Sequence, residues 1–142
     1  MLIDTHAHTN FNAFKEDRNE VIKRALDESV WIINIGTKYE TSASAVEIAE
    51  NYDKGVYAAI GLHPAHIKTD LLKQRMDPEE GGFLSSGEDF DREKYRALAG
   101  SKKVVAVGEI GLDYYYKPKS KGKRQLFKDK QKDVFLKQLE LV

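Results

Sequence analysis

The chain alternates short apolar runs with longer segments of helical periodicity, and this alternation constrains its fold more than any other feature. The clearest run is Val-Trp-Ile-Ile-Asn-Ile at residues 30–35, which ends at Gly36. A continuous apolar run of this length is typical of a strand buried on both faces. Such runs predict strands at residues 2–8, 30–35, 56–62 and 104–110. The segments between and after them predict helices that begin at Asp17, with Glu20 completing a capping box, and that cover 41–52, 90–99 and about 125–142.

Four strands that alternate with four helices predict a parallel sheet joined by right-handed crossovers, which is an α/β fold. The 142 residues are enough for one domain with a real core, and we expect residues 1–142 to form a single domain. In such folds, reactive side chains gather where strands end and loops begin.

Composition removes several kinds of chemistry. The chain has no cysteine, which excludes disulfides, thiolate metal sites and cysteine nucleophiles. Its formal net charge is zero, so a charged partner has to be inferred from local clusters of charge. No signal-peptide pattern and no apolar run long enough to span a bilayer is present, so we expect a soluble cytoplasmic protein without membrane contact.

Two segments carry charge of one sign. Residues 76–91 hold six acidic residues and neither lysine nor arginine, which predicts a solvated, mobile surface loop without a function. Residues 117–132 hold eight cations against one aspartate. This cationic segment is compatible with a solvated loop that leads into a helix. It is equally compatible with a surface that attracts DNA or RNA.

The motif Asp4-Thr-His6-Ala-His8 ends the first predicted strand. Side chains alternate along a strand, so Asp4, His6 and His8 are expected on one face. Neutral imidazole is a good ligand for first-row divalent metals, and two of the four histidines of the chain lie here. The simpler interpretation is that His6 and His8 are ordinary polar residues that bind no metal. Asp4 is either a third ligand or an acceptor that orients a histidine ring.

Glu109 lies at the end of the fourth predicted strand, and it would be costly to bury without a cation or another partner. Two histidines and one carboxylate suit Zn²⁺, Mn²⁺ or Fe²⁺, and a carboxylate can also bridge two cations. Two such ions, about 4 Å apart, activate water for attack at phosphorus. Asp113 is expected to form a salt bridge or to cap the following loop.

His63 follows the third predicted strand and precedes Pro64, which holds it extended. Its ring is predicted to reach the mouth of the site, either to bind a phosphate or to complete the metal shell. His66 is expected at the surface and outside the site.

The three motifs Asp4-Thr-His6-Ala-His8, Gly61-Leu-His63-Pro64 and Gly108-Glu109-Ile-Gly-Leu-Asp113-Tyr-Tyr, in this order, resemble those of the TatD family of metal-dependent deoxyribonucleases. The resemblance implies a (β/α)₈ TIM barrel, of which residues 1–142 would supply the first four βα units as a half barrel. It implies that His6 and His8 hold one ion, that Glu109 is catalytic and bridges to a second, and that His63 lies near the scissile phosphate. The implied cofactors are one or two Mg²⁺, Mn²⁺ or Zn²⁺ ions per complete site, and the implied substrate is DNA.

The later histidine and aspartate motifs of the family have no counterpart in this sequence, since no histidine follows His66. The chain could therefore be a truncated product, a half barrel completed by a second copy or a separate partner, or a small domain without catalysis. Two further functions stay open at this point. One is another metal-dependent phosphoesterase or ester deacylase, and the other is a non-catalytic binding module.

Overall fold

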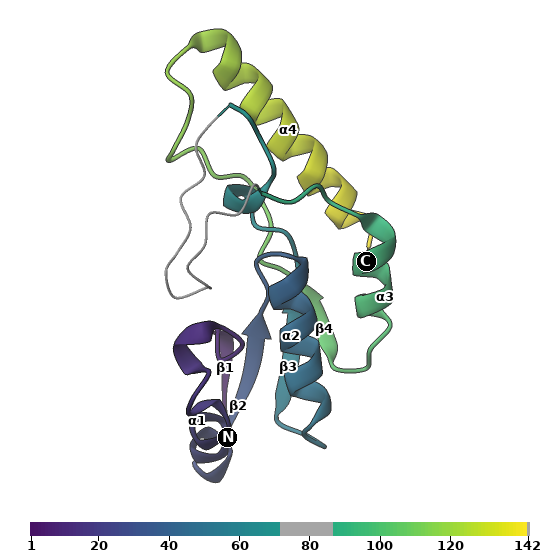
Figure 1. The fold of residues 1–142 in the computed structure, drawn as a ribbon. Helices are drawn as coiled ribbons and strands as arrows, with labels where there is room; N and C mark the ends of the chain where they lie inside the picture. The colour runs from purple at the N-terminus through teal and green to yellow at the C-terminus, as the bar shows by residue number, and fades with distance from the viewer. Residues whose placement is uncertain (72–86, 142) are drawn as a thin grey trace.

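The strands form one parallel sheet in the order in which they occur in the chain. A computed structural model describes residues 1–71 and 87–141. Its sheet has the order β1-β2-β3-β4, and each neighbouring pair is parallel (Figure 1). The strands are β1 (Leu2–Ala7), β2 (Val30–Ile35), β3 (Val56–Ile60) and β4 (Val104–Val107). The helices are α1 (Arg18–Asp27), α2 (Tyr39–Glu50), α3 (Arg92–Ala99) and α4 (Lys121–Leu139). The predicted α/β alternation of parallel strands and helices is therefore confirmed.

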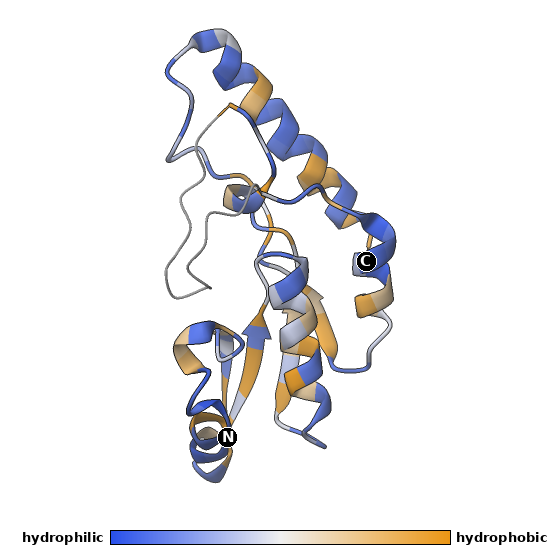
Figure 2. Cartoon of the chain, in the orientation of Figure 1, coloured by the Kyte–Doolittle hydropathy of each residue, from blue (hydrophilic) through white to orange (hydrophobic). Residues whose placement is uncertain are grey.

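Helices α1, α2 and α3 cover one face of the sheet and form its core. Ile22 of α1 packs with Ile32 of β2 and Val56 of β3, while Tyr95 of α3 packs with Ile60 in a second cluster. Figure 2 shows apolar residues along the strands and at several positions of α2 and α3.

The opposite face of the sheet is partly exposed in the described chain. It carries the rings of Trp31 and Tyr57, whose centroids lie 5.9 Å apart. At the two edges of the sheet, Leu2 is 70% exposed and Val105 is 51% exposed. No helix among the described residues is long and apolar enough to cross a membrane.

The element boundaries differ from the predicted ones in several places. The capping box at Asp17 is wrong, because the Asp17 side chain makes no capping hydrogen bond to α1. Helix α2 begins at Tyr39, earlier than predicted, because the Thr41 hydroxyl accepts hydrogen bonds from the backbone N–H groups of Thr37 and Lys38. Helix α4 also begins early, after a cap in which the Ser120 hydroxyl accepts from the Lys123 N–H.

The predicted acidic loop is only partly described, since residues 76–86 of it lie outside the described residues. Within the described part, the prediction of a solvated loop is wrong at Glu88. Its carboxylate accepts hydrogen bonds from the Tyr39 N–H at 2.8 Å and from the Tyr95 hydroxyl at 2.9 Å. Glu88 also pairs with Ile67 in an isolated parallel bridge. A carboxylate at the first turn of a helix is favourable, so Glu88 fastens this segment to α2.

The hydroxyl of Tyr95 predicts a measurable pH dependence of stability. Burial, reinforced by the Glu88 carboxylate, raises the pKa of Tyr95 far above its usual value. Above a pH of about 10 the unfolded chain releases this proton and the folded chain keeps it, so the stability contributed at lower pH is lost as the pH rises. We expect the free energy of unfolding to fall with pH more steeply in the wild type than in Tyr95→Phe. The difference between the two slopes should reach up to about 1.4 kcal/mol per pH unit.

Urea unfolding between pH 8 and 11 measures this difference. Tyr116→Phe is the matched control, because Tyr116 is 55% exposed and its replacement should leave the wild-type dependence unchanged. Parallel pH profiles for wild type and Tyr95→Phe would contradict the expectation.

Candidate metal centre

Strand β1 brings His6 and His8 to the carboxyl end of the sheet, as predicted. The Nδ1 atom of His8 lies 3.1 Å from the carbonyl oxygen of Ile35 at the end of β2. The ring also stacks on Phe11, with the two centroids 4.3 Å apart. A hydrogen bond from Nδ1 to a carbonyl assigns the proton to Nδ1 and leaves the Nε2 lone pair available to a ligand.

Glu109 is anchored to the same end of the sheet through its backbone. The N–H of Gly108 donates to Ile60 at 2.8 Å, and the N–H of Glu109 donates to Gly36 at 3.2 Å. A Cβ atom on Gly61 would lie 2.9 Å from the carbonyl carbon of Gly108, so the absent side chain lets the two backbones approach. The carboxylate of Glu109 is thereby placed opposite the His6 ring, with 3.6 Å between Oε2 and Nε2.

The structure therefore brings together three predicted residues: His6, His8 and Glu109 offer ligand atoms that all lie within 4.8 Å of one another. The 3.6 Å between His6 and Glu109 is longer than a direct hydrogen bond. It is close to the separation of two ligands bound to one ion, which is roughly 3 to 3.5 Å for bonds of about 2.1 Å. Two imidazole nitrogens and one carboxylate oxygen fit a divalent first-row metal.

His63 lies on the other side of the Glu109 carboxylate, with 3.7 Å between its Nε2 and Glu109 Oε1. Its backbone N–H donates to Thr37 at 2.7 Å. Its Nδ1 accepts from the Ala65 N–H at 3.1 Å, which leaves the proton of a neutral ring on Nε2. Of the two roles left open for His63, this arrangement favours a hydrogen-bond donor to a phosphate oxygen over a metal ligand.

Three other predicted residues have different outcomes. His66 is 9% exposed and its ring lies 5.9 Å from that of His63, so the prediction of a surface residue is wrong. Asp113 caps the following loop as expected, because its Oδ1 accepts from the Tyr115 N–H at 2.8 Å. Asp4 accepts from the backbone N–H of His6 at 3.0 Å, a contact to the main chain and not to a histidine ring.

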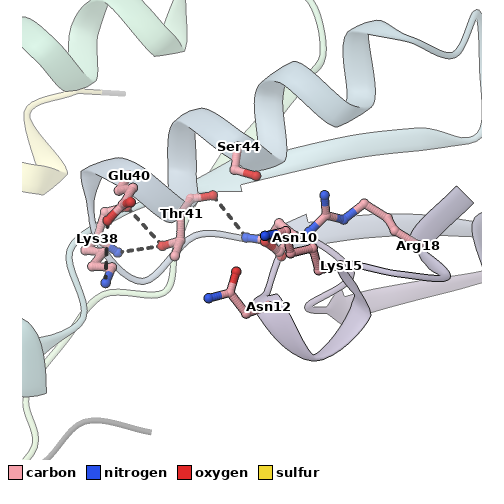
Figure 3. A pocket seen from close by; sticks show the side chains of 8 residues that line it. All are labelled: Asn10, Asn12, Lys15, Arg18, Lys38, Glu40, Thr41 and Ser44. Carbon is pink, nitrogen blue, oxygen red and sulfur yellow. Dashed lines mark hydrogen bonds and ion pairs between the residues drawn. The ribbon is translucent and has the colours of Figure 1, made fainter. Parts of the chain in front are cut away.

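A surface pocket lies between the connection that follows β1 and the start of α2. Its volume is about 280 Å³, and Figure 3 shows the side chains around it: Asn10, Asn12, Lys15, Arg18, Lys38, Glu40, Thr41 and Ser44. Asn10 donates to the carbonyl of Ile35 at 3.1 Å, the same carbonyl that His8 contacts. Sequence reasoning missed Asn10. The available signal was its position two residues after His8, in the connection that leaves the carboxyl end of β1.

Some cations of the segment 117–132 make contacts within the fold, and the others are exposed to solvent. Lys130 pairs with Asp89 at 3.8 Å, and Lys128 lies 4.9 Å from the centre of the Tyr114 ring. Arg124 donates to the carbonyl of Lys119 at 3.1 Å. The remaining cations of the segment that the structure describes as exposed are Lys117, Lys119, Lys121, Lys123 and Lys132.

Comparison with known proteins identifies the origin of these motifs. Residues 3–142 match the model of the family described as TatD related DNase. The chain is 37% identical over 142 residues to the metal-dependent hydrolase YabD of Bacillus subtilis, with 99% of this chain and 46% of that relative aligned. It is 31% identical over 102 residues to the 3'-5' ssDNA/RNA exonuclease TatD of Yersinia pseudotuberculosis, with 71% of this chain and 33% of that relative aligned.

A solved structure, that of the TatD homologue YjjV from Escherichia coli K12, has the same fold over this length. It superimposes with a TM-score of 0.65 at 31% identity, over 99% of this chain and 46% of that chain. The present chain thus spans about half the length of the relatives that it matches, and its four βα units are of the TIM-barrel type. Motifs, fold and family model agree, and the chain belongs to the TatD related DNase family of metal-dependent hydrolases.

Proposed function

We propose that residues 1–142 form one domain that supplies the metal centre of a hydrolase cleaving DNA phosphodiester bonds. The observation that carries the proposal is the convergence of His6, His8 and Glu109 within 4.8 Å at the carboxyl end of the sheet. Support for a nucleic acid substrate comes from the relative named 3'-5' ssDNA/RNA exonuclease, which is 31% identical to this chain.

In this proposal His6, His8 and Glu109 hold Mg²⁺, Mn²⁺ or Zn²⁺. A bound divalent ion lowers the pKa of water and stabilises negative charge on phosphoryl oxygens. The Ile35 carbonyl holds the His8 ring so that Nε2 faces the site. The two carboxylate oxygens of Glu109 divide their roles, since Oε2 faces His6 and Oε1 faces His63.

His63 and Glu109 are the residues assigned to substrate chemistry. The Nε2–H of His63 donates to a non-bridging phosphate oxygen, which orients the phosphorus next to Glu109. Oε1 of Glu109 would accept the proton that water releases as its oxygen bonds to phosphorus. The P–O bond to the leaving sugar oxygen breaks in the same step, and that oxygen takes a proton from solvent. The exposed lysines of the cationic segment add attraction for the polyanion, a contribution that added salt weakens.

The test is a nuclease assay on the full chain with labelled single-stranded DNA and Mn²⁺. Glu109→Gln should reduce cleavage at least about a hundredfold, because it removes a charged ligand and the proton acceptor together. The matched control is Glu47→Gln at an exposed position of α2, which should cleave like wild type. Equal cleavage by wild type and Glu109→Gln would assign the activity to a contaminant and contradict the proposal.

A further inference from the structure

Two of the buried residues of α4 are glutamines. The residues that this helix buries are Phe127, Gln131, Val134 and Gln138, a single stripe at helical spacing. Gln131 and Gln138 are each 1% exposed. A buried amide is costly unless its donor and its acceptor are both satisfied, so each glutamine needs specific partners.

Each glutamine binds both backbone groups of a single loop residue. Oε1 of Gln131 accepts from the Asp113 N–H at 2.9 Å, and its Nε2 donates to the Asp113 carbonyl at 2.9 Å. Oε1 of Gln138 accepts from the Leu62 N–H at 2.7 Å, and its Nε2 donates to the Leu62 carbonyl at 3.0 Å. Each glutamine amide thus makes one hydrogen bond to the N–H and one to the carbonyl of its loop residue.

Both loops lead directly into the candidate metal centre. Leu62 immediately precedes His63, and Asp113 lies four residues after Glu109. Helix α4 lies beyond the carboxyl ends of the strands in Figure 1, where these two loops emerge. Its amides therefore fix the backbone on either side of the 3.7 Å contact between His63 and Glu109.

We propose that Gln131 and Gln138 are positioning residues for the metal centre, an inference that rests on the proposed function. By holding Asp113 and Leu62, they set the separation between the Glu109 carboxylate and the His63 ring. Loss of the Gln131 hydrogen bonds frees the loop that follows Glu109, and loss of the Gln138 hydrogen bonds frees His63, which lies against the Glu109 carboxylate. In either case this carboxylate ligand is oriented only part of the time, so the ion binds more weakly.

The alternative is that the glutamines merely attach α4 to the domain. Val134 separates the two roles, because it lies between them on the same stripe, is 6% exposed, and packs in the cluster that contains Leu62. Val134→Ala is expected to weaken the attachment of α4 through packing, and it removes none of the groups that form the four amide hydrogen bonds. It is the matched control for the two glutamine variants.

The experiment is a titration of the full chain with Mn²⁺, followed by the electron paramagnetic resonance of the free ion. Methionine resembles glutamine in size but lacks its donor and acceptor, so the variants are Gln131→Met and Gln138→Met. Each should raise the Mn²⁺ dissociation constant about 10- to 100-fold, as the loss of a residue that orients a ligand does. Val134→Ala should change it by no more than about twofold.

Unchanged Mn²⁺ affinity in both folded methionine variants overturns the positioning role, as does an equal loss in Val134→Ala. A wild-type chain that binds no Mn²⁺ overturns the proposed function itself, which separates the two failures. Circular dichroism checks that each variant is folded.

A measurement on the wild-type chain decides the question if the variants unfold. Coupling between two sites is reciprocal, so an ion that gains affinity from the ordered loops must also stabilise them. Saturation with Zn²⁺ should slow amide hydrogen exchange at Leu62 and Asp113 at least tenfold. The amide of Ser101, which donates to Leu98 in the turn after α3, should be unaffected. Exchange at Leu62 and Asp113 that Zn²⁺ does not change contradicts the proposal.

Discussion

Replacement of His8 by alanine is expected to weaken Mn²⁺ binding more than about a hundredfold, because even residues that only orient a ligand contribute 10- to 100-fold. His8 is the better oriented of the two histidines. Its ring is held by the Ile35 carbonyl and by Phe11, whereas the side chain of His6 is 55% exposed. A preorganised ligand loses little freedom when the ion binds, so its removal has the larger effect.

Isothermal titration calorimetry with Mn²⁺ on the full chain measures this loss. Asn12→Ala changes an exposed residue of the same connection between β1 and α1 and should retain wild-type affinity. Wild-type affinity in His8→Ala would show that the ion is held elsewhere.

The largest effect on stability is expected from Gly36→Ala. A Cβ atom at this position would lie 2.2 Å from Oγ of Ser42 and 2.5 Å from its Cα, which is backbone of α2. Gly36 cannot move away, because its N–H donates to Ala59 at 2.9 Å and its carbonyl accepts from Glu109 at 3.2 Å. We expect a loss of about 3 kcal/mol or more in the free energy of unfolding, at the upper end of the range for overpacked cores.

Urea unfolding of the two glycine variants tests this expectation. The control is Gly122→Ala in α4, where the added Cβ meets nothing within 4 Å. It should stabilise the chain by about 0.5 to 1 kcal/mol, since alanine is the better helix former. A Gly36→Ala chain as stable as wild type would mean that α2 can shift away from the end of β2.

Much of the candidate site could be predicted from the sequence, because it depends on local periodicity. Alternation along β1 fixes the relation between His6 and His8, and parallel strands bring Glu109 to the same edge of the sheet. The prediction of β2 as residues 30–35 was confirmed to the residue, because the apolar run is bounded by Ser29 and Gly36. The prediction that both faces of this strand are buried was wrong, since Val30, Trp31 and Ile33 are only partly buried.

The errors lie where the partner is distant in the chain. Glu88 looked like one acid among six, and its partner Tyr39 lies 49 residues away. The burial of Gln131 and Gln138 could be predicted, since both fall on the apolar stripe of α4. Their partners Asp113 and Leu62 could not, because these residues lie in loops that follow other strands. Periodicity shows that such a residue is buried and cannot show which backbone it binds.

The link between Leu62 and Gln138 also has a consequence for the order of folding. It joins residues 76 positions apart, and closing a loop of that length costs more entropy than the pairing of neighbouring βα units. Strands β1 to β3 can pair as soon as they have been synthesised. The loop beside His63 is held in place only after the last turn of α4 has been synthesised. During synthesis His63 therefore emerges long before Gln138, the residue that holds its loop, and under the proposed function the geometry around the ion is completed only once α4 has formed.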